Sequence, residues 1–121
     1  EDLVAVEVEL RLDPGDPADL AAQRERCRGK RLDFEGRRSA GSVFRNPEAD
    51  AAGRLLDAAG CKGLRVGGAA VFARHANVIV TEPGATASDV LALMAMMRGR
   101  VLTTQGAELV SEIRIWQDST T

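Results

Sequence analysis

Apolar and polar residues alternate at the start of this chain. Every second position from residue 4 to residue 12 is apolar, and Glu7, Glu9 and Arg11 lie between the apolar positions. The apolar residues of the pattern are Val4, Val6, Val8, Leu10 and Leu12. A period of two places the two sets on opposite faces of an extended chain. The pattern therefore predicts a half-buried strand, which ends at the turn-forming residues 13–15.

A helix is predicted directly after this turn. Asp16 suits the N-cap position, Pro17 suits the first helical position, and the helix should end near Gly29. Few of its residues are apolar, which predicts a helix that lies on the surface. Residues 30–48 show neither a strand period nor a helix period, and we interpret them as a loop.

A second helix is predicted by apolar residues that recur on one helical face. They are Ala51, Ala52, Leu55, Leu56 and Ala59, followed by Gly60 as a C-terminal cap. A glycine-rich stretch over residues 63–68 leads into the apolar residues 69–72, and residues 77–81 predict a short strand.

A third helix is predicted after the turn at Pro83 and Gly84. Thr86 and Asp89 have the spacing of a capping box. The apolar stripe of this helix is Val90, Leu93, Met94, Met97 and Val101. Residues 108–116 alternate again, with Leu109, Ser111, Ile113 and Ile115 on one face, and predict a closing strand. This mixture of elements predicts an α+β fold: a single small domain with a mostly antiparallel sheet and about three helices packed on it.

Composition narrows the class of protein. A length of 121 residues is enough for one domain with a hydrophobic core, and the net charge of −2 gives no general attraction to nucleic acid or to a membrane. Cys27 and Cys61 have neither the spacing of a metal site nor a disulfide-rich pattern, so we interpret both as reduced thiols of a cytoplasmic protein. Because the sequence lacks an initiating Met and opens on a predicted strand, we interpret it as an excerpt from a longer polypeptide.

Residues 41–47, with the sequence GSVFRNP, carry the most informative polar groups. Gly41 lets the backbone approach a ligand closely, and the proline after Asn46 keeps that residue out of the α region. A hydroxyl and a carboxamide are therefore held a few residues apart. Taken alone, Ser42 is more often a turn hydroxyl than a catalytic group, and Glu112 is more often a solvated carboxylate.

Several short motifs resemble those of one enzyme family and follow the same order. Residues 40–47 (AGSVFRNP) resemble the signature loop of UDP-N-acetylenolpyruvoylglucosamine reductases, flavoenzymes that make UDP-N-acetylmuramate for peptidoglycan. Residues 52–57 (AGRLLD) and 60–63 (GCKG) resemble the next helix and turn of the family. Further matches are residues 67–69 (GGA), 75–77 (HAN) and 109–114 (LVSEIR).

The resemblance implies a division of the chain. Residues 13–121 would form the substrate-binding domain, and residues 1–12 would be the terminal strand of a preceding flavin-binding domain. FAD would be bound mainly outside this chain, with NADPH as the reductant and no metal. The chain has no tyrosine, so it resembles the branch of the family that lacks a substrate-contacting tyrosine loop.

The resemblance also implies roles for individual residues. Ser42 would donate a proton to the carbon beside the substrate carboxylate, and Glu112 would be a second acid that stabilises or protonates the intermediate. The substrate would be UDP-N-acetylglucosamine enolpyruvate. The residues implied in substrate binding are Asn46, Arg45, His75, Lys62 and Gly41. The catalytic arginine of the family would lie outside this chain, and we expect Ser42 and Glu112 to meet on one cavity wall.

Two other functions remain open from the sequence. A non-catalytic nucleotide-sugar-binding module could descend from such an enzyme, and an upstream flavin-binding region would distinguish the two. A nucleic-acid binder would use a basic run, but aromatic residues for base stacking do not alternate with its arginines, and the net charge of the chain is negative. The run is Arg24, Arg26, Arg28, Lys30, Arg31, Arg37 and Arg38. We interpret it as a solvated face, and we interpret Met94, Met96 and Met97 as core packing or helix surface.

Overall fold

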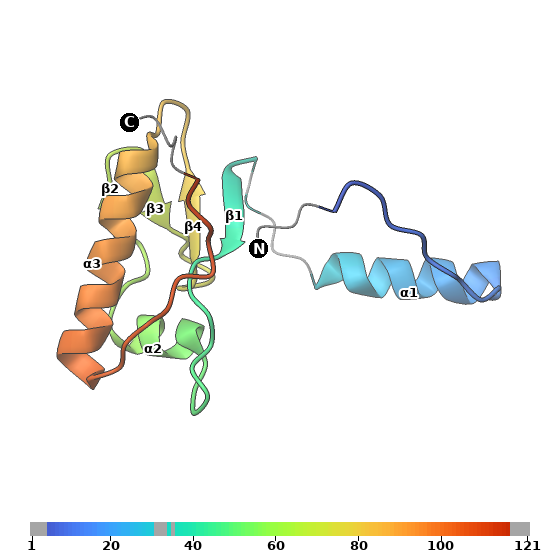
Figure 1. Ribbon diagram of the computed structural model, residues 1–121, viewed down its shortest axis with the longest axis horizontal. Coiled ribbons are helices and arrows are strands. Elements are labelled where there is room, and N and C mark those ends of the chain that lie inside the picture. Colours follow the sequence, from blue (N-terminus) through green and yellow to red (C-terminus); the bar gives the residue numbers. More distant parts are fainter. Residues whose placement is uncertain (1–4, 31–33, 35, 117–121) are drawn as a thin grey trace. The chain divides into compact units, whose positions relative to one another are not determined.

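The computed structural model describes residues 5–30, 34 and 36–116. The chain divides into two compact units between residues 33 and 34. The first unit contains helix α1 (Pro17–Gly29), and the second contains the other helices and the strands (Figure 1).

Helix α1 begins and ends where the sequence predicts. The carboxylate of Asp16 accepts hydrogen bonds from the backbone N–H groups of Ala18 (2.8 Å) and Asp19 (3.1 Å), and so caps the helix. No residue of α1 is buried, which confirms the prediction of a surface helix.

The strand predicted at the start of the chain is not formed in its described part, residues 5–12. These residues have no regular secondary structure, and Val6 and Leu12 are 94% and 81% exposed. A strand needs a neighbour to bond its backbone and a core to cover its apolar face. The described residues of the first unit contain neither a second strand nor a buried side chain. Val4 lies outside the described residues.

The second unit is built on a four-stranded antiparallel sheet with the order β1-β4-β3-β2. The strands are β1 (Arg38–Ser42), β2 (Arg65–Val66), β3 (Ala69–Val71) and β4 (Val78–Thr81). The glycine-rich stretch forms the β2–β3 hairpin, and β4 confirms the strand predicted over residues 77–81.

Strand β1 corrects the prediction of a loop over residues 30–48. It lies at the end of the sheet and pairs only with β4 among the described strands. Its residues alternate between exposed and half-buried, and none of them is fully buried. An edge strand of this kind carries no row of large apolar residues, so the hydrophobic pattern could not reveal it.

Helix α2 (Ala52–Ala58) ends as the sequence predicts, at a left-handed glycine. Gly60 has a φ of 67° and donates its N–H to the carbonyl of Asp57, while Cys61 donates to the carbonyl of Leu56, both at 2.9 Å. These two bonds form a Schellman motif, which satisfies the last carbonyls of the helix. Most of the predicted apolar face is buried, but Ala51 precedes the helix and is exposed.

Helix α3 (Ala87–Gln105) begins with the predicted capping box. The hydroxyl of Thr86 accepts from the N–H of Asp89 (3.2 Å), and the Asp89 carboxylate accepts from the N–H of Thr86 (2.9 Å). Leu93, Met94, Met97 and Val101 are buried, as the apolar stripe predicts. The helix packs on β2, β3 and α2 (Figure 1). Met96 is 41% exposed.

The closing strand predicted over residues 108–116 is not a regular strand. Its ladder is reduced to one isolated antiparallel bridge, between Phe44 and Ser111. The predicted alternation of burial is nevertheless present over residues 109–114: Leu109, Ser111 and Ile113 are buried or half-buried, and the residues between them are exposed. It ends at Ile115, which is 50% exposed. The segment runs beside the residues that follow β1 and is bonded to Val43 and Arg45 through the backbone of residues 110–113. The α+β fold class itself is confirmed, with three helices and a four-stranded antiparallel sheet among the described residues.

Candidate functional site

Ser42 ends strand β1 immediately after a bulge. Ser39 pairs with Val80 and Ser42 pairs with Val78, so two residues of β1 lie opposite one residue of β4. One of the two is Gly41, which has a φ of 84°. Glycine adopts this left-handed conformation without strain, and a bulge turns the strand that contains it. The Gly41 bulge therefore sets the direction in which the chain carries Ser42.

Glu112 is brought to the same place by a tertiary contact. Its backbone N–H donates a 2.8 Å hydrogen bond to the carbonyl of Val43, and the N–H of Arg45 donates a 2.9 Å bond to the carbonyl of Val110. These bonds flank the bridge between Phe44 and Ser111. Ser42 and Glu112 are both exposed, and the segments that carry them are joined.

Asn77 holds the Ser42 segment from the other side. It is the buried polar residue among those described, at 4% exposure. Its Oδ1 accepts from the N–H of Phe44 (2.9 Å), and its Nδ2 donates to the carbonyl of Phe44 (2.8 Å). In the sequence, Asn77 belongs to the motif over residues 75–77 and opens the strand predicted over residues 77–81, but neither pattern predicts this role. A signal was present, because an Asn next to the apolar strand residues 78–80 must find hydrogen-bond partners.

Asn46 uses its carboxamide oxygen to begin helix α2. Its Oδ1 accepts a 2.9 Å hydrogen bond from the N–H of Ala52, the first residue of the helix. Ala51, at the N-cap position, has no side-chain group for this purpose. One end of the Asn46 amide is therefore engaged within the protein.

Lys62 and His75 line one hollow of about 430 Å³, whose other lining residues include Arg54, Arg74 and Asp57. The Nζ of Lys62 lies 2.6 Å from Oδ2 of Asp57. Nδ1 of His75 accepts from the N–H of Asn77 at 3.3 Å, so it is joined through Asn77 to the Ser42 segment. The structure thus places Lys62 and His75 on one hollow, and joins the segment that carries Ser42 and Arg45 to the segment that carries Glu112 through backbone hydrogen bonds.

The start of α2 also carries an ion pair beside this hollow. The guanidinium of Arg54 donates to the carboxylate of Asp50, with one bond at 2.7 Å. These bonds from Arg54 are the main reason that the pKa of Asp50 falls from 3.8 to about 2.

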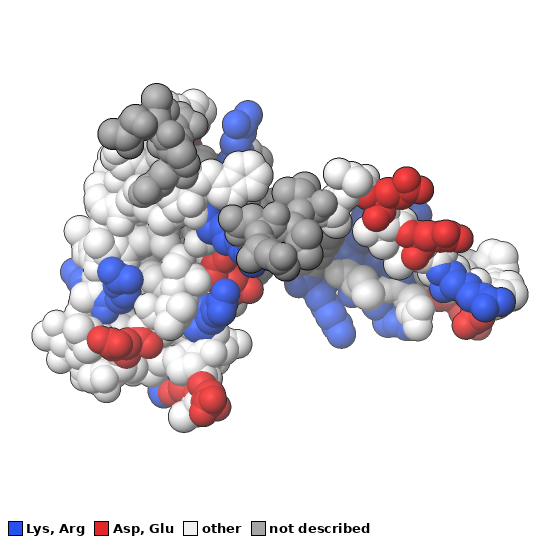
Figure 2. All heavy atoms as spheres, viewed as in Figure 1, with Lys and Arg blue, Asp and Glu red and all other residues white. Residues whose placement is uncertain are grey.

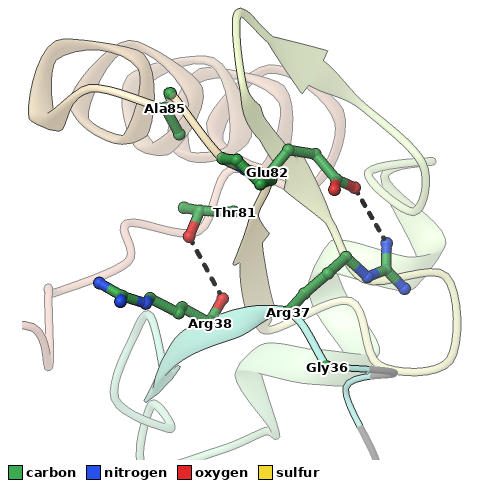
Figure 3. Close-up of a pocket in the computed structure, with 8 residues that line it drawn as sticks. Gly36, Arg37, Arg38, Thr81, Glu82 and Ala85 are labelled. Carbon is green, nitrogen blue, oxygen red and sulfur yellow. Dashed lines mark hydrogen bonds and ion pairs between the residues drawn. The ribbon is translucent and has the colours of Figure 1, made fainter.

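The five hollows that we describe are lined by residues other than Ser42 and Glu112. One of about 270 Å³ is lined by Ser39, Ala40, Ile79 and Ile113, and so contains close chain neighbours of both candidates. The largest of the five, about 550 Å³, contains none of the predicted site residues. In this hollow the side chains of Arg37 and Glu82 point toward one another, with Nη1 of Arg37 3.8 Å from Oε1 of Glu82 (Figure 3).

The other sequence expectations concern surfaces and ligands. In the basic run, the described residues are exposed except for Arg37, which is half-buried; Arg31 lies outside the described residues. Figure 2 shows acidic and basic side chains mixed along the unit that contains α1, as expected of a solvated face. The described residues contain no group of three or more His, Cys, Asp or Glu that could hold a metal ion. They also contain no helix long and apolar enough to cross a bilayer.

Comparison with known proteins identifies the family. Residues 32–116 match the family model described as UDP-N-acetylenolpyruvoylglucosamine reductase, C-terminal domain. The chain therefore belongs to this family and contains its C-terminal domain.

Individual relatives agree with this assignment. A UDP-N-acetylenolpyruvoylglucosamine reductase of Heliobacterium modesticaldum is 46% identical over 98% of this chain and 39% of its own length. One of Rubrobacter xylanophilus is 44% identical over 93% of this chain and 38% of its own length. The crystal structure of the reductase from Thermus caldophilus aligns with a TM-score of 0.62 at 37% identity, over 83% of this chain and 34% of that one. The chain thus spans about two fifths of the length of these curated relatives.

Proposed function

We propose that this chain is the substrate-binding and proton-donating domain of a flavin-dependent reductase of peptidoglycan synthesis. The enzyme would convert UDP-N-acetylglucosamine enolpyruvate to UDP-N-acetylmuramate with NADPH as the reductant. The observation that carries the proposal is the contact between the Ser42 segment and the Glu112 segment in a chain of this family. A shared chemical task explains why two exposed polar residues so distant in the sequence lie on joined segments.

Ser42 and Glu112 would handle the proton and the negative charge of this reaction. When a hydride adds to the enolpyruvyl double bond, charge develops on the substrate carboxylate, and the carbon beside it must receive a proton. The hydroxyl of Ser42 would donate that proton. A serine hydroxyl is a weak acid in water, so it must be held in place and shielded from solvent to act. Glu112 would stabilise the charged intermediate or protonate it.

The hydride requires a cofactor that this chain would not hold by itself. When bound, FAD supplies the hydride after reduction by NADPH. The flavin and the catalytic arginine would belong mainly to the part of the polypeptide outside this chain. Ser42 and Glu112 are exposed, which fits a ring that approaches them from outside the domain. Residues 1–12 would pair with that preceding domain, and its core would cover their apolar side chains.

The remaining candidate residues would bind the rest of the substrate. Asn46 would orient it through Nδ2, since Oδ1 already caps α2. Lys62 and His75 would contact the diphosphate or the sugar from their common hollow, and Arg45 would do so from the Ser42 segment. Gly41 would allow the backbone to approach. The two cysteines are free thiols, which suits the reducing cytoplasm that we propose as the location.

The test is the Ser42→Ala variant of the complete polypeptide that contains this sequence. Its two half-reactions are measured separately in a stopped-flow spectrometer by flavin absorbance. Reduction of the flavin by NADPH should be nearly unchanged, because Ser42 takes no part in it. Reoxidation by the enolpyruvyl substrate should be slowed about 10²–10⁴-fold, the range for loss of a general acid. An equal loss in both half-reactions would reject the proton-donor role.

A further inference from the structure

Asn77 is built into the fold as a substitute for a strand neighbour. Its carboxamide bonds both the N–H and the carbonyl of one residue, Phe44, at 2.9 Å and 2.8 Å. This is the pair of bonds that a backbone residue exchanges in an antiparallel ladder. The side chain is almost fully buried, so solvent cannot replace these bonds.

The backbone around Asn77 continues the same contact. The carbonyl of Asn77 accepts a 2.9 Å bond from the N–H of Val43, and the next residue, Val78, pairs with Ser42. Three consecutive residues, from Ser42 to Phe44, are therefore fixed by Asn77 and Val78. The same stretch forms the bridge to Ser111 on its other side.

We infer that Asn77 is a positioning residue, which acts through the backbone from Ser42 to Phe44 to aim the candidate proton donor. The inference rests on the proposed function, because it is the proton transfer from Ser42 that is positioned. The bulge at Gly41 lets the backbone turn before Ser42, and the carboxamide of Asn77 fixes the backbone of Phe44 after the turn. Since residues 43–45 also anchor the segment of Glu112, Asn77 holds the distance between the two acids as well.

Substitution at this position has a specific consequence for the Ser42 segment. Alanine would leave the N–H and the carbonyl of Phe44 without partners in a buried place, which the backbone can relieve only by moving toward solvent. Aspartate keeps the shape and the acceptor oxygen of Asn77 but directs a carboxylate oxygen at the carbonyl of Phe44. A shift of the order of 1 Å in a reacting group can slow an enzymatic step about 100-fold.

The experiment compares the Asn77→Ala and Asn77→Asp variants of the complete, flavin-loaded polypeptide with the wild type. Val101→Ala is the matched control, because Val101 is fully buried in α3 and is outside the Ser42 segment. Thermal melts establish that the control is destabilised to a similar degree. We expect both Asn77 variants to slow flavin reoxidation by the enolpyruvyl substrate between about ten-fold and 100-fold. Flavin reduction by NADPH should be unchanged in them, and Val101→Ala should change neither half-reaction.

Hydrogen exchange supplies a readout that does not depend on activity. In the wild type, a peptide over residues 41–46 should exchange slowly at the amides of Val43 and Phe44. The same peptide should exchange faster in an Asn77 variant than in Val101→Ala. If neither Asn77 variant folds, the wild-type exchange decides, because rapid exchange at Phe44 would show that the carboxamide does not hold it.

The outcomes separate this inference from the proposed function. Normal reoxidation in the Asn77 variants, with reoxidation slowed in Ser42→Ala, would overturn the positioning role and leave the proton donor in place. Normal reoxidation in Ser42→Ala would overturn both. An equal loss in Val101→Ala would reduce Asn77 to a contributor to stability and would also overturn the inference.

Discussion

The backbone N–H of Glu112 donates a 2.8 Å hydrogen bond to the carbonyl of Val43, the residue that follows Ser42. The segment that carries Glu112 is not a strand of the sheet. It is joined to the residues after β1 by the isolated bridge between Phe44 and Ser111 and by the backbone hydrogen bonds on either side of that bridge. Backbone hydrogen bonds, which do not depend on the identity of the side chains, therefore join the segments of the two candidate acids. The position of Glu112 depends on the path of residues 43–45, and that path depends on Gly41 and Asn77.

Gly41→Ala should destabilise the domain by roughly 1–2 kcal/mol, the cost of a left-handed backbone for a residue with a side chain. Gly41 has a φ of 84°, and a Cβ built there would meet no atom within 4 Å, so the cost is conformational and not steric. Denaturant melts of this chain measure the change. Gly99→Ala is the control: Gly99 lies within α3 with equally open surroundings, and alanine there should stabilise by up to about 1 kcal/mol. A Gly41→Ala variant as stable as Gly99→Ala would contradict the prediction.

Asn46→Ala should destabilise the domain by about 0.5–2 kcal/mol, because helix α2 loses the acceptor for the N–H of Ala52. Asn46→Asp keeps that acceptor and should recover most of the stability, as measured by thermal melts. In the complete enzyme, however, Asn46→Asp should still raise the KM for the enolpyruvyl substrate, since aspartate lacks the Nδ2 donor that we propose to orient the substrate. If Asn46→Asp has the stability and the KM of the wild type, Asn46 caps helix α2 and does not orient the substrate.

Cys27 should react with iodoacetamide much faster than Cys61 in the native chain. Cys61 is fully buried, and burial raises the pKa of its thiol, whereas Cys27 is exposed. The thiolate is the reacting species, so both factors slow Cys61. Mass spectrometry of tryptic peptides follows the two sites. Unfolding in denaturant should remove the difference, and equal rates in the native chain would show that the core around Cys61 is open.

The stability of the domain should fall as the pH is lowered from about 4 toward 2, in part because of Asp50. The pKa of Asp50 is lowered from 3.8 to about 2 in the folded chain, chiefly by hydrogen bonds from Arg54. A carboxylate with a depressed folded pKa stabilises the fold above its unfolded pKa and loses this effect as it is protonated. Hydrogen bonds from the backbone of Thr86 and Gly68 lower the pKa of Asp89 as well, and the sign is the same.

Thermal melts across this pH range test the role of the ion pair. Asp50→Asn should show a weaker dependence on pH than the wild type between pH 4 and 2. Because the pair is exposed, added salt should reduce the difference between the two proteins. Identical pH profiles would show that the pair between Asp50 and Arg54 does not contribute to stability.

The candidate site could be predicted only in part from the sequence. The motif over residues 41–47 pointed to Ser42 and Asn46, but no pattern revealed that Oδ1 of Asn46 is engaged by α2. The sequence likewise gave no reason to join His75 to the Ser42 segment, a connection that runs through Asn77. Such links depend on residues that are distant along the chain and adjacent only after folding.

The sequence by itself determined the three helices and at least one end of each. Asp16 caps α1, Thr86 and Asp89 cap α3, and Gly60 ends α2, because each of these signals acts on backbone groups only a few residues away. Apart from β4, which the apolar run over residues 78–80 predicts, the tertiary structure decided which extended segments become strands. Residues 5–12 alternate regularly yet form no strand, whereas residues 38–42 have a weak pattern and form β1. A strand forms only where a neighbouring segment has N–H and carbonyl groups to which it can bond, and the fold determines which segments are neighbours. Asn77 and Val78 provide these groups for residues 42–44.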